Sequence, residues 1–531
     1  MRLFKTFVPF VLAGLVAFSG CQDLSVTNQN DPNRERALSQ PGDIETLIQG
    51  TFRTYYYASE DYEPTFALSV AADEQSSSWG NFGMQDMGSE PRTTYNNDPS
   101  YGYSAVAEIP FTNSYAAISA ALDGLGAIEG GLEINNPDQT ARAKAFGEFV
   151  IGLAHANIAV NFDQGFIVDE VPTGQFDAEN PPFEIVPYTD VWTNGALPYL
   201  NQAISTAESA SFSSIPSGWM GATEFSRDEF IAIIRMYRAH YRAAMARNSQ
   251  ERQSVDWQQV LNDVDAGYTE MVDDVFAIND PQENWFSGWR YYGKDPVWTR
   301  ADYKTIGPAD KSGNYDDWLN SDLSQRFPID ITTDDRRITG AGDSETPQEQ
   351  SDGKYFAYAG ASFFPSDRGI YHYSNYAYLN RNPGPRYSYA QGNEKWIVTP
   401  ATMRLLKAEA LLHLDPVANK PEVVDIINQT RVQVGELPAA QVTDPTGTMG
   451  DSQNPIRTDG ATVWSMLKHE KRMESFGTLS GLAFYDKRGW GDLVNGTPFH
   501  LPIPGAELEL LREAIYTTGT VGNNGKADRT E

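Results

Sequence analysis

The chain has 531 residues, of which 40% are hydrophobic and 12% aromatic, so it is long enough to bury a large core. Its 71 acidic residues outnumber its 40 lysines and arginines, which gives a formal net charge of -31. A field of that sign repels phosphate backbones, so we predict no nucleic acid partner. The sequence holds one cysteine, so no disulfide framework stabilises the fold.

Residues 1–21, MRLFKTFVPFVLAGLVAFSGC, have the pattern of a bacterial secretory signal. A basic start precedes an apolar run from Phe7 to Ala17, and small residues follow that run. The run is too short to cross a bilayer, which takes about 20 apolar residues. We therefore predict that the segment is a cleaved signal peptide.

The single cysteine, Cys21, lies directly after the small residues Ser19 and Gly20. The stretch FSGC at 18–21 resembles a lipobox, in which the thiol is acylated and becomes the new N-terminus. We predict that Cys21 is the lipid anchor, bearing palmitate-type chains, and that the polar residues 22–40 form a tether. The alternative is a stray cysteine at the end of a cleaved peptide.

Apolar residues recur at spacings of three and four between residues 41 and 273, as on one face of a helix. The pattern predicts an N-terminal helical region, while 61–110 is predicted to be irregular because glycine, proline and asparagine are frequent there. Asn136-Pro137 and the pair Ser226 and Glu229 provide helix-start signals. The predicted helices are about 44–57, 115–132, 137–160, 192–204, 226–241 and 257–271.

The composition changes from residue 274 to residue 398, where helical periodicity disappears and aromatic residues, glycine, proline and asparagine dominate. The segment 284–298, NWFSGWRYYGKDPVW, has six aromatic residues in fifteen. Periodicity returns in the region 399–531, which opens with the cap signal Thr399-Pro400. Helices are predicted there at about 399–411, 421–434 and 460–475, the third being the last, and a frayed stretch at 517–531.

Several short motifs of the chain occur in the same order as in the SusD/RagB family. They are TPATMRLLKAEA at 399–410, NQTRV at 428–432, EKRME at 470–474, FYDKRGWG at 484–491 and LPIPGAE at 501–507. LSVTNQN at 24–30 and ADE at 72–74 also resemble the family pattern. The resemblance therefore extends from Cys21 to about residue 511.

The resemblance implies a mainly α-helical fold, in which a tetratricopeptide-like scaffold carries long irregular loops. It implies a non-enzymatic, surface-exposed lipoprotein of the outer membrane, without a cofactor. Such a protein would capture an oligosaccharide or peptide nutrient and pass it to a SusC-like TonB-dependent transporter. It also implies that the ligand-binding aromatic residues lie in the loop after the first helix and in the middle of the chain.

Aromatic residues in the predicted loops are the candidates for ligand binding, because no helical periodicity requires their burial. A flat ring covers the apolar face of a sugar without demanding one pattern of hydroxyl groups. The alternative is that these rings form small cores of the loops themselves. The predicted ligand-binding residues are Trp79, Asn81, Trp285, Trp289, Tyr291 and Trp298.

Signals for catalysis are weak in this sequence. The six histidines are scattered, with no two at metal-ligand spacing, so we predict no metal site. With 71 acidic residues, a pair at glycosidase distance is not excluded, and a secreted glycan-degrading hydrolase is the alternative function. A purely structural scaffold is a third. We interpret Glu470, Arg472 and Glu474 as intramolecular ion pairs that hold a helix.

Overall fold

The computed structural model describes residues 38–171, 177, 181–270, 276–280, 284–360, 373–379, 381, 394–451 and 461–517. The predicted signal peptide with Cys21, and the tether up to residue 37, lie outside the described residues, as does nearly all of the stretch 517–531. Among the described helices, none has the length and apolar content that a membrane-crossing segment requires.

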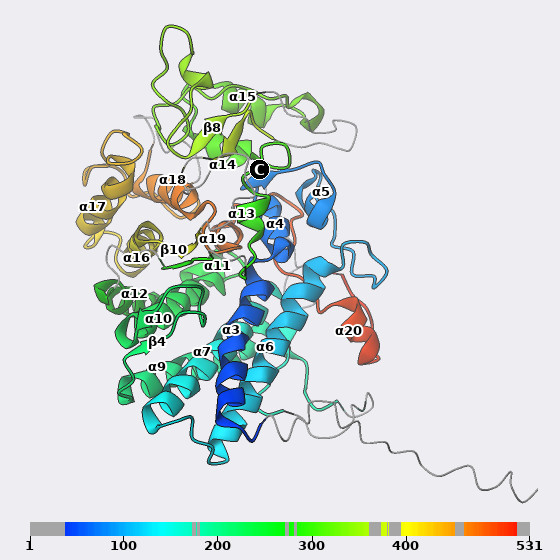
Figure 1. Ribbon diagram of the computed structural model, residues 1–531. Coiled ribbons are helices and arrows are strands. Elements are labelled where there is room, and N and C mark those ends of the chain that lie inside the picture. Colours follow the sequence, from blue (N-terminus) through cyan, green and yellow to red (C-terminus); the bar gives the residue numbers. More distant parts are fainter. Residues whose placement is uncertain are drawn as a thin grey trace, which may run out of the picture.

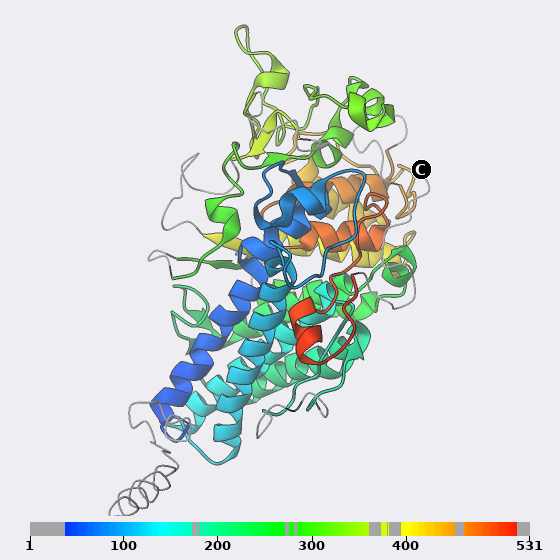
Figure 2. The same cartoon turned by 90° about the vertical axis from the view of Figure 1, so that its right-hand side faces the viewer.

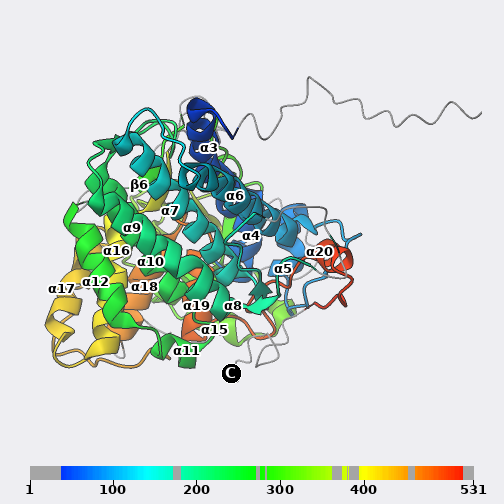
Figure 3. The same ribbon diagram turned by 90° about the horizontal axis from the view of Figure 1, so that it is seen from below.

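Long helices lie side by side in the N-terminal half of the molecule (Figures 1 and 3). They are α3 (Pro41–Glu60), α6 (Ala105–Glu129), α7 (Pro137–Asn161), α9 (Leu197–Ser209), α10 (Arg227–Ala244) and α12 (Trp257–Glu270). Helix α3 packs on α6 and α7, α7 packs on α9, and α10 packs on α12. The mainly α-helical fold predicted from the sequence is confirmed, and each predicted helix of this half is present.

Two helix starts form as their sequences predict. The Asn136 side chain accepts a hydrogen bond from the backbone nitrogen of Gln139 at 2.9 Å, and Pro137 occupies the first turn of α7. Ser226 and Glu229 form a complete capping box at the start of α10. Short elements connect these helices: α8 (Tyr188–Asp190), the π-helix η2 (Val191–Ala196) and α11 (Ser249–Gln253), with the pairs β2 (Gln164–Gly165) and β3 (Val186–Pro187), and β4 (Ser214–Ile215) and β5 (Phe225–Ser226).

The prediction that residues 61–110 are irregular is only partly right, because this stretch contains helix α4 (Tyr62–Ala71) and the first turns of α6. Every residue of α4 from Pro64 to Ala71 is buried. A helix that is apolar on all sides lacks the one-face periodicity on which the prediction depends. The 3-10 turn η1 (Asn81–Gly83) and the short helix α5 (Met84–Gly88) follow it.

The middle of the chain consists of short elements and connecting segments. Its strands form two-stranded antiparallel pairs: β6 (Phe276–Ile278) with β10 (Lys395–Val398), β8 (Phe356–Tyr358) with β9 (Tyr376–Tyr378), and β1 (Gln75–Ser76) with β7 (Arg300–Ala301). Its helices have at most seven residues: α13 (Gly288–Tyr291), α14 (Tyr303–Ile306), α15 (Asn314–Asn320), η3 (Gly307–Ala309), η4 (Leu323–Gln325) and η5 (Gln348–Gln350). Much of this part lies above the helical half in Figures 1 and 2.

The C-terminal region returns to the helical half, where α16 (Pro400–Leu414) packs on α12. Thr399 caps α16, and α17 (Lys420–Arg431) and α18 (Val463–Ser475) agree with the prediction. The prediction that α18 is the last helix is wrong, because α19 (Leu482–Trp490) and α20 (Gly505–Leu510) follow it. Most of α19 is buried and α20 has six residues, so neither gives a periodic signal.

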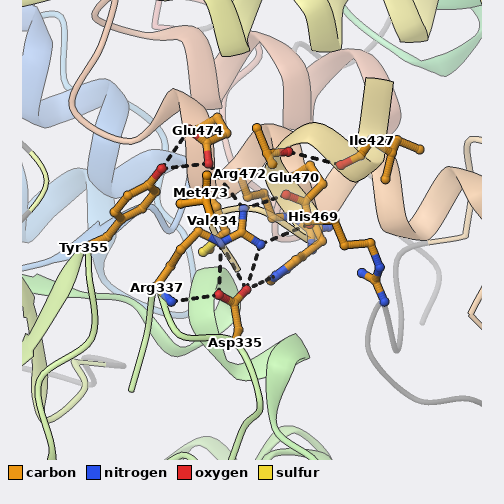
Figure 4. A network of polar contacts seen from close by, with 12 residues as sticks. Asp335, Arg337, Tyr355, Ile427, Val434, His469, Glu470, Arg472, Met473 and Glu474 are labelled. Atoms are coloured by element: carbon orange, nitrogen blue, oxygen red, sulfur yellow. Dashed lines mark hydrogen bonds and ion pairs between the residues drawn. The ribbon is translucent and has the colours of Figure 1, made fainter. Parts of the chain in front are cut away.

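A buried polar network attaches the middle of the chain to α18 (Figure 4). The Arg337 guanidinium donates from Nη1 to Glu470 Oε2 at 2.5 Å and from Nη2 to Asp335 Oδ2 at 2.8 Å. The Tyr355 hydroxyl donates to Glu474 Oε1 at 2.9 Å. Two segments more than a hundred residues apart in sequence are thereby held together.

The interpretation of Glu470, Arg472 and Glu474 as intramolecular ion pairs is confirmed, but their partners lie outside helix α18. Glu470 and Glu474 pair with Arg337, and Glu474 also pairs with Arg381. Arg472 instead donates from Nη2 to Asp492 Oδ2 at 3.3 Å. Helix α18 is therefore fixed on two sides by separate ion pairs.

Candidate functional site: an aromatic surface

A row of half-buried aromatic rings lies where the segment after α3 meets the segment around α13. We call it the aromatic surface. Helix α13 packs against α4, and the two are neighbours at the centre of Figure 1. The six rings come from α4, the loop after it and residues 286–298; they are Tyr62, Trp79, Phe82, Phe286, Tyr291 and Trp298.

One end of the aromatic surface contains two tryptophans. The ring centres of Trp79 and Trp298 are 5.1 Å apart, and the two planes meet edge to face at 63°. The indole nitrogen of Trp79 donates to the carbonyl oxygen of Val297 at 2.8 Å. This bond satisfies the polar group of Trp79 and fixes the ring, so its remaining exposed surface is apolar.

The buried ring of Tyr292 joins the tryptophans to the other end of the row. It stacks on Trp298 at 5.3 Å and meets Phe82 edge to face at 5.1 Å. Phe82 in turn stacks on Tyr62, with ring centres 4.2 Å apart and planes 6° apart. Tyr292 therefore connects Trp79 and Trp298 with Phe82 and Tyr62 in one continuous set of ring contacts.

The backbone at Phe82 has a positive φ of 56°, which is unfavourable for a bulky L-residue. Such a conformation persists only where the surrounding structure enforces it, and strained residues concentrate at functional sites.

Beyond Tyr62, the row continues to Phe286, with ring centres 4.6 Å apart, and from Phe286 to Tyr291, with ring centres 5.0 Å apart. The rings of Phe286 and Tyr291 are stacked, with 14° between their planes.

Polar groups border the aromatic surface. Asn81 is exposed and precedes Phe82 in η1. Asp61 accepts a hydrogen bond from the Tyr62 backbone nitrogen at 2.7 Å, which caps α4. Burial, with the Asp61 carboxylate close by, raises the pKa of Glu63 to about 7. An amide and two carboxyl groups are thus near rings that offer apolar faces.

Two predicted ligand-binding residues are not part of this surface. Trp285 is 6% exposed and packs in the main core against Phe52 and Tyr56, at ring distances of 6.0 and 5.6 Å. Trp289 is also 6% exposed and packs against Phe476 at 5.5 Å in a second core. Neither presents a ring face to a ligand, so both are removed from the candidate site.

The structure brings together Trp79, Asn81, Tyr291 and Trp298 of the predicted set, and adds Tyr62, Phe82 and Phe286, which the prediction left out. The density of aromatic residues in 284–298 was the signal for Phe286, whereas Tyr62 lies in a helix that the sequence pattern does not indicate. Within the described residues, no group of three or more histidine, cysteine or acidic side chains is arranged to hold a metal ion.

No family model matches the sequence, and no curated protein matches it either. Solved structures do match the fold. A SusD superfamily protein from Bacteroides vulgatus aligns with a TM-score of 0.55 at 17% identity, over 89% of this chain and 97% of that one. One from Parabacteroides distasonis aligns with a TM-score of 0.55 at 13% identity, over 90% and 98%.

A SusD-like carbohydrate binding protein from Bacteroides fragilis aligns with a TM-score of 0.52 at 14% identity, over 92% of this chain and 94% of that one. At these identities the likeness concerns the fold, and it extends over nearly the whole of each chain. The helical half, the short-element middle and the returning C-terminal helices therefore form one known architecture. This chain has the fold of the SusD superfamily.

Proposed function

We propose that the protein is a non-enzymatic lipoprotein of the outer membrane surface that captures an oligosaccharide on the aromatic surface and passes it to a SusC-like TonB-dependent transporter. The single observation that carries the proposal is the continuous row of half-buried rings on a SusD-like fold. One structural neighbour is described as a carbohydrate binding protein, which favours a glycan over the alternative, a peptide.

The physical basis is the apolar C–H face of a sugar ring, which a flat aromatic side chain covers. If one contact removes about 50–80 Å² from water, it is worth roughly 1–2 kcal/mol. Two or three contacts supply about 2–6 kcal/mol, and the cost of ordering the ligand lowers that sum, so we expect a Kd of about 0.1 mM or weaker. An affinity in that range suits capture followed by release to a partner.

Replacing Trp79 or Trp298 with alanine is expected to weaken oligosaccharide binding by about 5- to 30-fold each, because each variant removes one ring contact. The measurement is calorimetry on the full chain with a panel of neutral oligosaccharides and peptides. A non-ionic detergent without a sugar headgroup avoids competition for the rings. Binding of a peptide alone would favour the alternative ligand class.

Phe327 provides the matched control, because its ring is 65% exposed and lies outside the aromatic surface. Phe327→Ala is expected to leave affinity unchanged, and thermal unfolding of all three variants identifies any loss of structure. Equal affinity of Trp79→Ala, Trp298→Ala and the parent protein would contradict the placement of the site. Turnover of a panel member that one carboxylate substitution abolishes would favour the hydrolase.

The lipid anchor is a separate part of the proposal. Cys21→Ala is expected to move the protein from the outer membrane fraction to the soluble fraction or to leave it unprocessed. A single acyl chain binds membranes only marginally, so stable attachment requires the several chains of a lipoprotein. The measurement is sedimentation after a high-salt wash, since salt removes ionic adhesion. A variant that still sediments with washed membranes would refute the anchor.

A SusC-like TonB-dependent transporter is the proposed partner, because a captured glycan still has to cross the outer membrane. A capturing protein alone does not move its ligand across a bilayer, so the proposal requires a TonB-dependent barrel next to it. Purification of the full chain from outer membranes tests the partnership. The expected result is a TonB-dependent barrel in a fixed ratio to the chain, and its absence would contradict this part of the proposal.

A further inference from the structure

A cavity of about 810 Å³ lies apart from the aromatic surface, and none of the six rings of that surface lines it. Its volume is within the range of about 300–1,000 Å³ that is usual for small-ligand sites. Segments distant in the sequence form its wall, including Asp73, residues 319–323 and Lys487. In contrast to the aromatic surface, its lining is mainly charged and polar.

Arg326 lines this cavity and is fixed in place by neutral partners. Its Nε donates to the carbonyl oxygen of Ser321 at 3.1 Å, and its Nη2 donates to that of Leu319 at 2.6 Å. The guanidinium carbon lies 5.0 Å from the ring centre of Trp318. In the part of the chain that the structure describes, Nη1 has no hydrogen-bond partner and no carboxylate pairs with Arg326.

Three further cations line the same cavity: Lys304, which pairs with Glu90, and Lys487 and Arg472. The Lys487 ammonium donates to the carbonyl oxygen of Ala72 at 2.5 Å and to the Thr305 hydroxyl at 3.3 Å, and no ion pair with a described carboxylate accompanies these bonds. Burial lowers the pKa of Lys487 to about 8. Arg472 uses Nη2 on Asp492, while its buried Nε and Nη1 have no partner among the described residues.

Most of the carboxylates in the lining are already paired or hydrogen-bonded. The ion pairs are Asp73 with Arg92 at 2.6 Å, Glu90 with Lys304, and Asp492 with Lys468 at 2.7 Å. Asp310 accepts from the backbone nitrogens of Tyr315 and Thr332. Asp316 is half-buried and Asp322 is exposed, where water screens its charge. Arg326 and Lys487 are therefore the cations of this lining that form no ion pair with a described carboxylate.

We propose that this cavity binds the anionic group of an acidic saccharide, either a uronate carboxylate or a sulfate ester, with Arg326 as the contacting residue. The Arg326 guanidinium is fixed in place and its Nη1 can donate to either anion. Such charge-assisted hydrogen bonds are stronger than hydrogen bonds between neutral groups. The side chains of Asn320, Ser321 and Asn495 in the lining offer partners for sugar hydroxyl groups. The site is separate from the aromatic surface, and the inference does not depend on sugar binding there.

The test is calorimetry on the full chain with three probes: galacturonic acid trisaccharide, a sulfated galactose trisaccharide and the neutral galactose trisaccharide. At least one acidic probe is expected to bind about 10-fold or more tightly than the neutral one. Arg326→Gln is expected to weaken that binding by about 10-fold or more, because the charged donor is lost. Which acidic probe binds distinguishes the carboxylate from the sulfate ester.

Asp322→Asn is the matched control, because it removes one exposed negative charge from the same cavity. It is expected to bind the acidic probe at least as tightly as the parent protein, whereas Arg326→Lys keeps the charge and is expected to be intermediate. Thermal unfolding verifies that each variant is folded. Failure of both acidic probes, equal binding of the neutral probe, or full binding by folded Arg326→Gln would overturn the proposal. Trp298→Ala is expected to leave the preference for the acidic probe unchanged.

Discussion

Replacing Arg337 with methionine is expected to lower the free energy of unfolding by about 3–5 kcal/mol, the usual cost of breaking a buried ion pair from one side. Arg337 is fully buried and pairs with three carboxylates, those of Asp335, Glu470 and Glu474. Without the guanidinium, these groups remain in the interior with less compensation for their charge. Urea unfolding followed by tryptophan fluorescence measures the difference.

Lys354→Ala is the matched control for this prediction. Lys354 pairs with Glu436 at 2.8 Å, but the two side chains are 43% and 57% exposed. Exposed pairs contribute about 0–1 kcal/mol, so this variant is expected to unfold almost as the parent protein does. A loss below about 1 kcal/mol in Arg337→Met would show that the network does not hold the middle of the chain to α18.

The loss of stability in Arg337→Met is expected to depend on pH, because Arg337 pairs with the carboxyl group of Asp335. Burial alone would raise the pKa of Asp335, but Arg337 and the hydrogen bond with His469 at 2.8 Å lower it below its ordinary value. A carboxyl group with a lowered pKa contributes stability above its unfolded value of about 3.9, and that stability is lost as the pH falls. The difference between Arg337→Met and the parent protein is therefore expected to be larger at pH 7 than near pH 4.

Local sequence signals account for the parts of the fold that were predicted correctly. The capping box at Ser226 and Glu229 and the cap at Asn136 act within one helical turn, so neighbouring residues determine them. Helix α10 likewise has a clear apolar face that packs on α12. Helices α4 and α19 were missed because neighbours on several sides bury them, and those neighbours come from distant parts of the chain.

The candidate site was predicted to the level of the segment but not of the residue. The aromatic density of 284–298 indicated a stretch that contributes three rings, Phe286, Tyr291 and Trp298, to the aromatic surface. Whether a ring in that stretch is exposed depends on contacts with Phe52 in α3 or with Phe476 after α18. The local spacing of residues in a sequence does not reveal contacts between residues that are far apart in the chain. The boundaries predicted for the regions 41–273, 274–398 and 399–531 stay predictions.

Trp289 is the residue for which burial changes the expected result most. Trp289→Ala is expected to lower the free energy of unfolding by about 3–5 kcal/mol, because a large side chain is removed from a packed core. Its ring contacts Phe66 at 6.1 Å, Tyr378 at 6.2 Å and Phe476 at 5.5 Å, from three separate parts of the chain. The Lys395 ammonium lies 5.9 Å from the ring centre, which adds a cation–π contact.

The two classes of tryptophan are therefore expected to separate in a pair of measurements made on the same variants. Folded Trp289→Ala should keep the oligosaccharide affinity of the parent protein while unfolding at lower urea. Trp79→Ala should show the reverse, because its half-buried ring contributes less to the core than to the aromatic surface. If Trp289→Ala lost affinity with unchanged stability, the Trp289 ring of the parent protein would have to leave the core and contact the ligand. That result would contradict the assignment of Trp289 to the core and of Trp79 to the sugar-binding surface.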